Sequence, residues 1–184
     1  MTVKSNRFIL TPAEEGGFVA FDPITKSVSQ GETKDEAISN LSEAVGLYLD
    51  ENAVTRTATC RCGELSVTCK GEPVRVSVCH CYDCQKRSGS AFAAKGQFIV
   101  AAVTLRGDAK CYEHITGSGN TADFYFCPTC GSTLWFQARP HNDLISIPIG
   151  NFADHDFPAP RLSIYEERMH PWVAIDGDKI EHHD

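Results

Sequence analysis

The fold of this chain is decided by the stretch Cys127-Pro128-Thr129-Cys130-Gly131, which repeats the pattern of an earlier stretch, Cys60-Arg61-Cys62-Gly63. In both stretches two cysteines stand in a short turn, and a glycine directly follows the second cysteine. Glycine takes the positive φ of a tight knuckle, which lets backbone N–H groups approach the thiolates. Two such knuckles supply the ligands of one closed, tetrahedral zinc site. The pattern therefore predicts a structural zinc held by Cys60, Cys62, Cys127 and Cys130.

A third cluster, Cys79-His80-Cys81-x-x-Cys84, offers three more thiolates. Three protein ligands with a free fourth position are the arrangement of a catalytic zinc. His80 is an alternative fourth ligand, although three consecutive residues rarely all reach one ion from an extended chain. Its other interpretations are contact with a ligand or simple exposure. The sequence thus predicts two zinc ions per chain, with the catalytic ion held by Cys79, Cys81 and Cys84.

The compartment decides between metal ligands and disulfides. The first residues are mixed and charged, without the apolar core of a signal peptide. We therefore expect a reducing cytoplasm, where clustered cysteines bind metal or take part in catalysis, with disulfides as the alternative. Cys69 and Cys111 stand outside the clusters in strand-like segments, which predicts that both are buried as apolar side chains.

Composition excludes two classes of partner. The chain has 184 residues, 42% of them hydrophobic, which is enough for a folded core. Its 24 acidic residues against 17 Lys and Arg give a net charge of −7, and no basic run stands out. Because phosphate binding needs a positive surface, we expect no nucleic-acid partner. No run of about eighteen apolar residues exists, so we expect no membrane partner either.

The pattern predicts two domains, residues 1–52 and 53–184. The first reads as strands at 7–10, 17–21 and 27–30, with a turn at 14–17, followed by a helix that ends at residues 50–52. Thr33 is the expected N-cap of that helix, with Glu36 in capping-box position. Its expected apolar stripe comprises Ala37, Leu41, Ala44, Val45, Leu47, Tyr48 and Leu49.

The second domain is expected to be mainly β. Apolar and polar residues alternate at 65–69, 74–78, 124–126, 134–136 and 145–149, and a Gly-rich turn stands at 117–120. Many short strands separated by such turns favour stacked antiparallel sheets over a βαβ unit. The predicted fold class is therefore mainly β, preceded by a small α+β domain.

Two stretches of the first domain carry a family resemblance. The runs at 14–23, EEGGFVAFDP, and 27–51, SVSQGETKDEAISNLSEAVGLYLDE, resemble the small HicB-type antitoxin domain over roughly residues 5–51. That resemblance implies a ββ(β)α sheet packed on a helix. It also implies binding to a partner protein or self-association through the sheet, so a homodimer through residues 1–52 is one expectation.

The order of motifs in the second domain carries another resemblance. After the first knuckle come the 79–84 cluster with Arg87-Ser-Gly-Ser-Ala-Phe92, then Phe126 before the second knuckle, Ile147-x-Ile-Gly150 and a late Trp172. Over residues 57–174 this order resembles the glutathione-dependent formaldehyde-activating, centromere-protein-V-like family. The resemblance implies a zinc-binding β-tent fold with one structural and one catalytic zinc. It also implies a carbon–sulfur lyase whose substrates are glutathione and formaldehyde, or their adduct S-hydroxymethylglutathione.

An anionic thiol substrate requires positive charge near the catalytic cluster. Lys86 and Arg87 are the nearest candidates in sequence, with Lys95 and Arg139 further away, and surface charge is the alternative for each. Candidates for proton transfer are His80, His114 and His170, although a lone histidine on a strand is more often structural. Trp135 and Trp172 are expected to fill the core or line a pocket.

Two functions follow from these patterns. The first is a zinc-dependent carbon–sulfur lyase that acts on S-hydroxymethylglutathione or a related small thiol adduct. The second is a zinc-stabilised binding module without catalysis, whose N-terminal domain engages a partner. A vacant coordination position at residues 79–84 favours the enzyme.

Overall fold

The computed structural model describes residues 3–4, 8–51, 54–117, 119–139, 143–177 and 179–184. These residues form two compact units, Met1–Thr55 and Arg56–Asp184. Arg7, Asn52 and Ser118, which belong to a predicted strand, helix end and turn, lie outside the described residues. The predicted domain boundary between residues 52 and 53 lies outside them as well.

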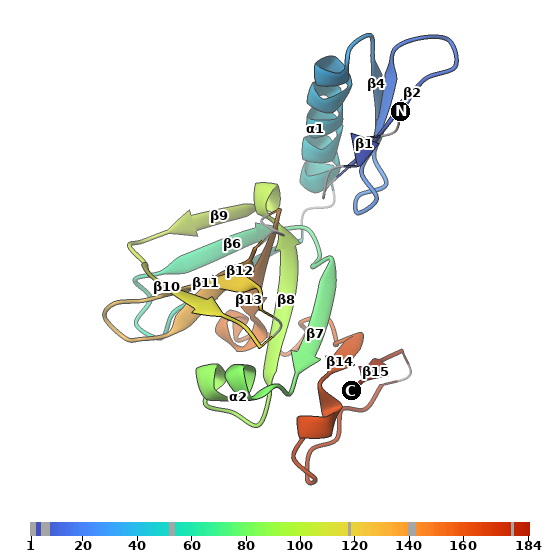
Figure 1. The fold of residues 1–184 in the computed structure, drawn as a ribbon. Helices are drawn as coiled ribbons and strands as arrows, with labels where there is room; N and C mark the ends of the chain where they lie inside the picture. Colours follow the sequence, from blue (N-terminus) through green and yellow to red (C-terminus); the bar gives the residue numbers. More distant parts are fainter. Residues whose placement is uncertain (1–2, 5–7, 52–53, 118, 140–142, 178) are drawn as a thin grey trace. The chain divides into compact units, whose positions relative to one another are not determined.

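The first unit is a four-stranded antiparallel sheet followed by one long helix (Figure 1). Its strands lie side by side in chain order: β1 (Val3–Lys4), β2 (Ile9–Pro12), β3 (Phe18–Phe21) and β4 (Val28–Gly31). A turn with two glycines of positive φ, Gly16 and Gly17, joins β2 to β3. Helix α1 (Lys34–Glu51) packs on β3 and β4, which gives the small α+β fold expected from the sequence.

The start and the buried face of α1 follow from its sequence. Thr33 Oγ1 accepts a hydrogen bond from the N–H of Glu36 at 3.2 Å, which confirms the predicted N-cap. The Glu36 carboxylate accepts from the N–H of Glu32 at 2.9 Å, one residue before the partner of a regular capping box. The buried residues recur every four positions: Ala37, Leu41, Val45 and Leu49. The predicted burial of Leu47 and Tyr48 is wrong, because both lie off this face and are 64% and 42% exposed.

The second unit stacks a large sheet on a small one. The strand order is β10-β11-β12-β13-β8-β7-β14-β15 in the large sheet and β5-β6-β9 in the small one (Figure 1). Along the chain the strands are β5 (Thr55–Thr59), β6 (Ser66–Lys70), β7 (Arg75–Cys79), β8 (Ala93–Ile99), β9 (Val103–Arg106), β10 (Lys110–Ile115), β11 (Thr121–Phe126), β12 (Thr133–Ala138), β13 (Leu144–Pro148), β14 (Leu162–Ile164) and β15 (Glu181–His183). The predicted mainly β class with stacked antiparallel sheets is confirmed.

Two features of this unit differ from the expectation. Strands β14 and β15 run parallel to β7, although the other pairs described are antiparallel. A short helix, α2 (Tyr82–Ser88), follows the cluster at residues 79–81, and it has no buried residue. A helix without a buried face shows no apolar periodicity, which is why the pattern did not predict it. Three 3-10 turns complete the unit: η1 (Val100–Ala102), η2 (Ile149–Phe152) and η3 (Glu166–Arg168).

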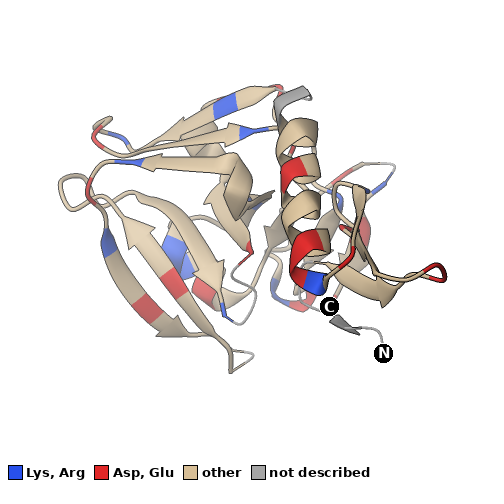
Figure 2. Ribbon diagram, turned by 90° about the horizontal axis from the view of Figure 1, so that it is seen from above, with Lys and Arg blue, Asp and Glu red and all other residues tan. Residues whose placement is uncertain are grey.

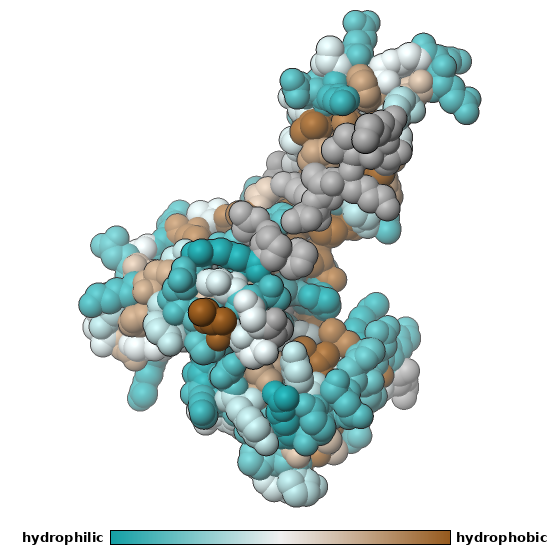
Figure 3. Space-filling model, viewed as in Figure 1, coloured by the Kyte–Doolittle hydropathy of each residue, from teal (hydrophilic) through white to brown (hydrophobic). Residues whose placement is uncertain are grey.

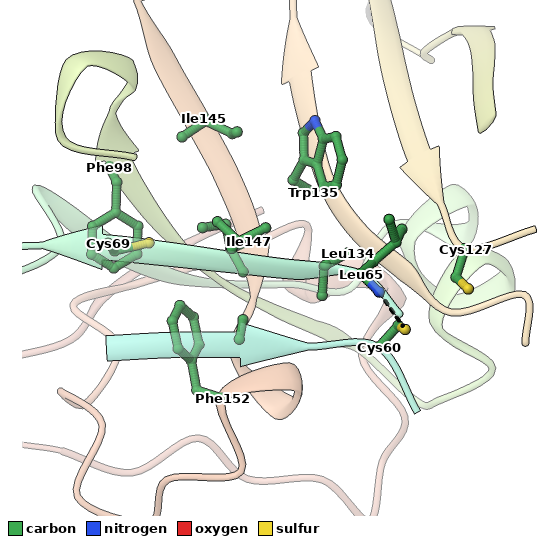
Figure 4. Close-up of a cluster of buried hydrophobic side chains, with 12 residues drawn as sticks. Cys60, Leu65, Cys69, Phe98, Cys127, Leu134, Trp135, Ile145, Ile147 and Phe152 are labelled. Carbon is green, nitrogen blue, oxygen red and sulfur yellow. Dashed lines mark hydrogen bonds between the residues drawn. The ribbon is translucent and has the colours of Figure 1, made fainter. Parts of the chain in front are cut away.

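The core of the second unit contains side chains from both of its sheets (Figure 4). Its largest fully buried members are Phe98, Leu65, Leu134 and Ile147. Cys60 and Cys127 also belong to this core, so the knuckles close one end of it. Cys69 is buried as predicted, whereas the predicted burial of Cys111 is wrong. Cys111 is exposed because it lies on β10, the strand at the edge of the large sheet.

Polar and charged residues are prominent on the faces drawn in Figures 2 and 3. Figure 2 shows acidic residues at intervals along α1. On the face drawn in Figure 3, hydrophilic residues cover most of the surface and hydrophobic residues form small separate areas. Among the described residues, the helices lack the combination of length and apolar character that crossing a membrane requires.

Candidate metal centre and active site

Two turns of the second unit bring four cysteines together, which we call the closed cluster: Cys60 and Cys62 after β5, and Cys127 and Cys130 after β11. All four sulfur atoms lie within 4.8 Å of one another. The Sγ–Sγ distance is 3.5 Å between Cys60 and Cys62 and 3.6 Å between Cys62 and Cys127. Tetrahedral zinc with bonds of about 2.3 Å places its sulfur ligands roughly 3.8 Å apart, whereas a disulfide needs about 2.05 Å. The sulfur positions therefore fit a metal ion and exclude disulfides within this cluster.

The backbone of both turns has the predicted knuckle geometry. Gly63 has φ +84° and Gly131 has φ +74°, which confirms the positive φ expected at each. The N–H of Gly63 donates to the carbonyl of Cys60 at 3.0 Å, and the N–H of Gly131 donates to that of Cys127 at 2.9 Å. The N–H of Leu65 reaches Cys60 Sγ at 3.2 Å (Figure 4). Such N–H donors stabilise negative charge on the sulfur.

Side chains tie the two knuckles to each other. The N–H of Arg61 donates to Ser132 Oγ at 3.3 Å, and Thr129 Oγ1 donates to the Glu64 carboxylate at 2.6 Å. Hydrogen bonding by Ser132 lowers the pKa of the Cys130 thiol to about 5. The closed cluster therefore joins two segments that are distant in sequence and readily holds a thiolate.

The third group of cysteines, Cys79, Cys81 and Cys84, lies where β7 meets α2, and we call it the open cluster. Its three sulfur atoms also lie within 4.8 Å of one another. Cys79 is 5% exposed, and the other two are half-buried. Cys81 is the N-cap of α2, with its sulfur accepting a hydrogen bond from the N–H of Cys84 at 3.4 Å. The helix start thus aims a backbone donor at a ligand sulfur.

Two neighbouring strands hold the open cluster from both sides. Cys79 pairs in register with Ala93 of β8 and with Ile164 of β14. The N–H of His80 donates to the Ile164 carbonyl at 3.0 Å. The central strand of a three-strand arrangement has little freedom, so the cluster has a rigid base.

Hydrogen bonds among the three cysteines of the open cluster favour a thiolate at Cys84. A hydrogen bond from Cys79 lowers the pKa of Cys84 to about 5, with smaller contributions from Cys81 and from the charges of Arg87 and Lys95. The pKa of Cys79 is raised because it donates that hydrogen bond and is buried. Cysteines lose their protons when they bind metal, and three adjacent thiolates suit a soft divalent ion such as zinc.

Two of the four predicted cations lie at the open cluster. Arg87 follows Cys84 by three residues on α2, and its guanidinium lies 4.9 Å from the ring centre of Phe136. Lys95 Nζ lies 5.4 Å from the same ring. Lys86 is exposed, and Arg139 bonds the Asp123 carboxylate at 2.8 Å instead. The structure therefore selects Arg87 and Lys95.

His80 is buried, so the expectation that it lies exposed is wrong, and neither of its ring nitrogens is grouped with the three sulfurs of the open cluster. It is 0% exposed, its Nε2 lies 3.2 Å from Ser163 Oγ, and burial lowers its pKa. Its Nδ1 is buried without a hydrogen-bond partner among the described residues. Ser163 also bonds Glu166, whose carboxylate lies 2.8 Å from His182 Nδ1. His80 therefore anchors the cluster to the C-terminal segment.

The other two histidines predicted as candidates for proton transfer contact α2. His114 Nε2 lies 3.5 Å from the Asp83 carboxylate, and His170 Nε2 lies 3.3 Å from Gln85 Oε1.

The two tryptophans differ from each other. Trp135 is buried and stacks on Tyr125 at 5.0 Å, as predicted for a core residue. The expectation for Trp172 is wrong, because its side chain is 75% exposed and rests against His170.

Sequence reasoning missed Gln85, Ser163 and Glu166, which support the open cluster. Gln85 Nε2 donates to the carbonyls of His80 at 2.6 Å and Arg168 at 3.1 Å. The contacts of Gln85 with Arg168 and of Ser163 with His80 each span 83 positions of sequence, and no local pattern signals such contacts.

A family model matches the part of the chain that contains the site. The family model described as "glutathione-dependent formaldehyde-activating enzyme" matches residues 55–168. A comparison with curated proteins gives no match. Among solved structures, a crystal structure of a Rhodobacter sphaeroides protein is similar, with 22% identity and a TM-score of 0.42 over 52% of this chain and 85% of that chain. The family match includes both cysteine clusters and spans most of the chain, so the chain belongs to the glutathione-dependent formaldehyde-activating enzyme family.

Proposed function

We propose that this chain is a zinc-dependent carbon–sulfur lyase that forms or splits adducts of a small thiol with an aldehyde, such as S-hydroxymethylglutathione. The observation that carries the proposal is the open cluster, whose three sulfurs leave one position of a tetrahedral ion for a substrate. Membership of the family supports glutathione and formaldehyde as the substrates.

The two clusters have different roles in this proposal. Cys60, Cys62, Cys127 and Cys130 hold a structural zinc, because four thiolates complete its coordination. Cys79, Cys81 and Cys84 hold the catalytic zinc. The proposal also requires a reducing compartment such as the cytoplasm, because oxidised cysteines do not bind zinc.

The reaction joins a thiol sulfur to a carbonyl carbon. In the direction of synthesis the C–S bond forms, the C=O double bond becomes a single bond, and the thiol proton ends on the oxygen. Zinc, when bound, lowers the pKa of a thiol that occupies the free position and so supplies thiolate near neutral pH. The cysteine ligands of this chain are electron-rich, which favours activation of the thiol over polarisation of the carbonyl. Arg87 and Lys95 offset the negative charge that accumulates at Cys84.

The test is exchange of formaldehyde with glutathione, followed by NMR exchange spectroscopy on zinc-loaded protein. We expect the wild-type chain to accelerate exchange and Cys81→Ser to abolish the acceleration. Cys111→Ser is the matched control, because Cys111 is exposed and belongs to neither cluster. Equal exchange in the presence of wild-type protein and Cys81→Ser would contradict the proposal and favour a binding module without catalysis.

We further propose that residues 1–52 form a HicB-like domain that mediates homodimer formation. Two observations support this proposal. Strand β4 is at an edge of its sheet and carries Val28, which is 60% exposed, and Leu47 on α1 is 64% exposed. Light scattering should give the mass of a dimer for the wild-type chain and of a monomer for Val28→Lys, whereas a monomeric wild-type chain at high concentration would contradict it.

A further inference from the structure

We propose that Arg87 and Lys95 form an anion subsite that binds a carboxylate of the thiol substrate. The proposal rests on the proposed function, because it takes the thiol to approach the open cluster. It goes further by naming the residues that bind a carboxylate of that thiol.

The first step is the convergence of both cations on one ring. Arg87 comes from α2 and Lys95 from β8, yet they lie 4.9 and 5.4 Å from the centre of Phe136. Arg87 also lies 5.6 Å from the ring centre of Phe124, which stacks on Phe136 at 5.0 Å. The aromatic pair thus gathers two positive groups around Phe136 in spite of their mutual repulsion.

Among the described residues, these two charges have no carboxylate partner. Within the described parts of the chain, neither Arg87 nor Lys95 pairs with a carboxylate, and Arg87 Nη2 is buried without a hydrogen bond. Asp83 stands four residues before Arg87, where a helical ion pair can form, but its carboxylate faces His114 instead. A buried donor without a partner lowers stability. A bound ligand that supplies a hydrogen-bond acceptor to Arg87 Nη2 would therefore complete this site.

Burial strengthens the same argument for Lys95. Desolvation lowers the pKa of Lys95, and the neighbouring Cys84 and Cys79 sulfurs act against that effect. An incoming anion would likewise favour the charged form of the amine. Arg139 differs from Arg87 and Lys95, because its guanidinium donates hydrogen bonds to the Asp123 carboxylate and so already has an anionic partner.

The position of the subsite limits the ligand. Residues three apart on a helix have their Cβ atoms about 5–6 Å apart, so Arg87 stands one turn from the sulfur of Cys84. A carboxylate at Arg87 must therefore lie a few bonds from the sulfur that reaches the open cluster. The planar guanidinium matches a carboxylate in bidentate geometry. Peptidic thiols such as glutathione meet both conditions, whereas simple uncharged thiols do not.

The alternative explanation is that both cations only offset the charge of the cysteine thiolates. Binding measurements separate the two explanations without any catalysis. The probes are S-methylglutathione and its glycine amide, which have blocked thiols and differ only in the glycyl carboxylate. A third probe, S-methylcysteinylglycine, keeps that carboxylate and lacks the γ-glutamyl one. Each is titrated by calorimetry into zinc-loaded wild-type protein, Arg87→Met and Lys86→Met.

We expect the wild-type chain to prefer a carboxylate-bearing probe over the probe that lacks that group by about tenfold or more. Arg87→Met should lose this preference, and Lys86→Met, a neighbouring exposed cation on the same helix, should keep it. If wild-type protein binds the amide more weakly than S-methylglutathione, the glycyl carboxylate is the group that occupies the subsite. If it binds S-methylcysteinylglycine more weakly, the γ-glutamyl carboxylate is that group. Zinc content and circular dichroism confirm that each variant is folded.

Equal weakening of all probes by Arg87→Met would overturn the subsite and leave charge compensation as the role of both residues. Failure of S-methylglutathione to bind wild-type protein at millimolar concentration would overturn it as well. The result is independent of formaldehyde exchange. If the preference depends on Arg87 but formaldehyde exchange is not accelerated, the subsite is supported and the proposed reaction is contradicted. If exchange is accelerated but the preference is absent, the proposed reaction is supported and the subsite is contradicted.

Discussion

The closed and open clusters use the same ligand atom in opposite structural settings. The closed cluster joins the turn after β5 to the turn after β11, and two of its sulfurs belong to the hydrophobic core. The open cluster takes its sulfurs from one short stretch, in which Cys79 ends a strand and Cys81 caps a helix. The closed cluster therefore connects segments that would otherwise separate, whereas the open cluster connects only neighbours.

This difference teaches how one chain can assign two tasks to one kind of ligand. A metal ion that joins distant segments contributes its binding energy to folding. A metal ion bound by adjacent residues contributes little to the global fold, so its remaining coordination position is available for chemistry. The side-chain environment agrees with this division, because aromatic rings and two cations without a carboxylate partner among the described residues lie beside the open cluster.

The largest expected effect comes from removing one ligand of each cluster. Cys62 is the exposed member of the closed cluster, so Cys62→Ser removes a ligand with little damage to core packing. We expect Cys62→Ser to lower the free energy of unfolding by several kcal/mol, which is a large part of the roughly 5–15 kcal/mol that stabilises a domain. Cys81→Ser should lower zinc content from two ions to one and leave the unfolding midpoint nearly unchanged. Urea unfolding and metal analysis of both variants check this, and equal destabilisation would contradict the division of roles.

A smaller effect is expected from the glycine that ends each cluster. Gly131 has φ +74° and Gly89, the C-cap of α2, has φ +62°, so alanine at either position costs about 1–2 kcal/mol locally. Gly131→Ala should lower the free energy of unfolding of the second unit by about that amount, because the closed cluster is part of its core. Gly89→Ala should instead speed amide hydrogen exchange in α2 and lower the affinity of the open cluster for zinc. We expect little change in the free energy of unfolding of the second unit. Identical global effects would contradict the comparison.

The sequence predicts the two clusters unequally well. Spacing alone groups the cysteines, and the structure brings the same sulfurs within 4.8 Å of one another in each group. Their role as zinc ligands stays a prediction. The positive φ of Gly63 and Gly131 follows from their place after a cysteine knuckle, and strand alternation predicts the buried Val67 and Cys69.

What the sequence misses depends on contacts between distant segments. Ser163 meets His80 only because β14 pairs with β7 in parallel, a pairing that leaves no local pattern. The roles of Arg87 and Arg139 could not be separated in sequence, because the difference lies in whether a cross-strand carboxylate such as Asp123 is present. Helix α2 lacks a buried face, so periodicity does not reveal it.

The smallest expected effect concerns the support of the open cluster by Glu166. A hydrogen bond from Ser163, together with His182, lowers the pKa of the Glu166 carboxyl. A lowered folded-state pKa gives stability that is present above the unfolded value of about 4.3 and is lost as the pH falls through the folded value. Glu166→Gln should therefore reduce stability by under about 1 kcal/mol at pH 7, and wild type and variant should converge at low pH. Glu167→Gln, which removes an exposed ion pair with Arg168, is the matched control.

If Glu166 supports the open cluster through Ser163 and His80, its variant should slow formaldehyde exchange more than the control does at equal stability. Equal exchange rates for the two variants would mean that Glu166 stabilises β14 and β15 without supporting the open cluster. The support would then come from β8.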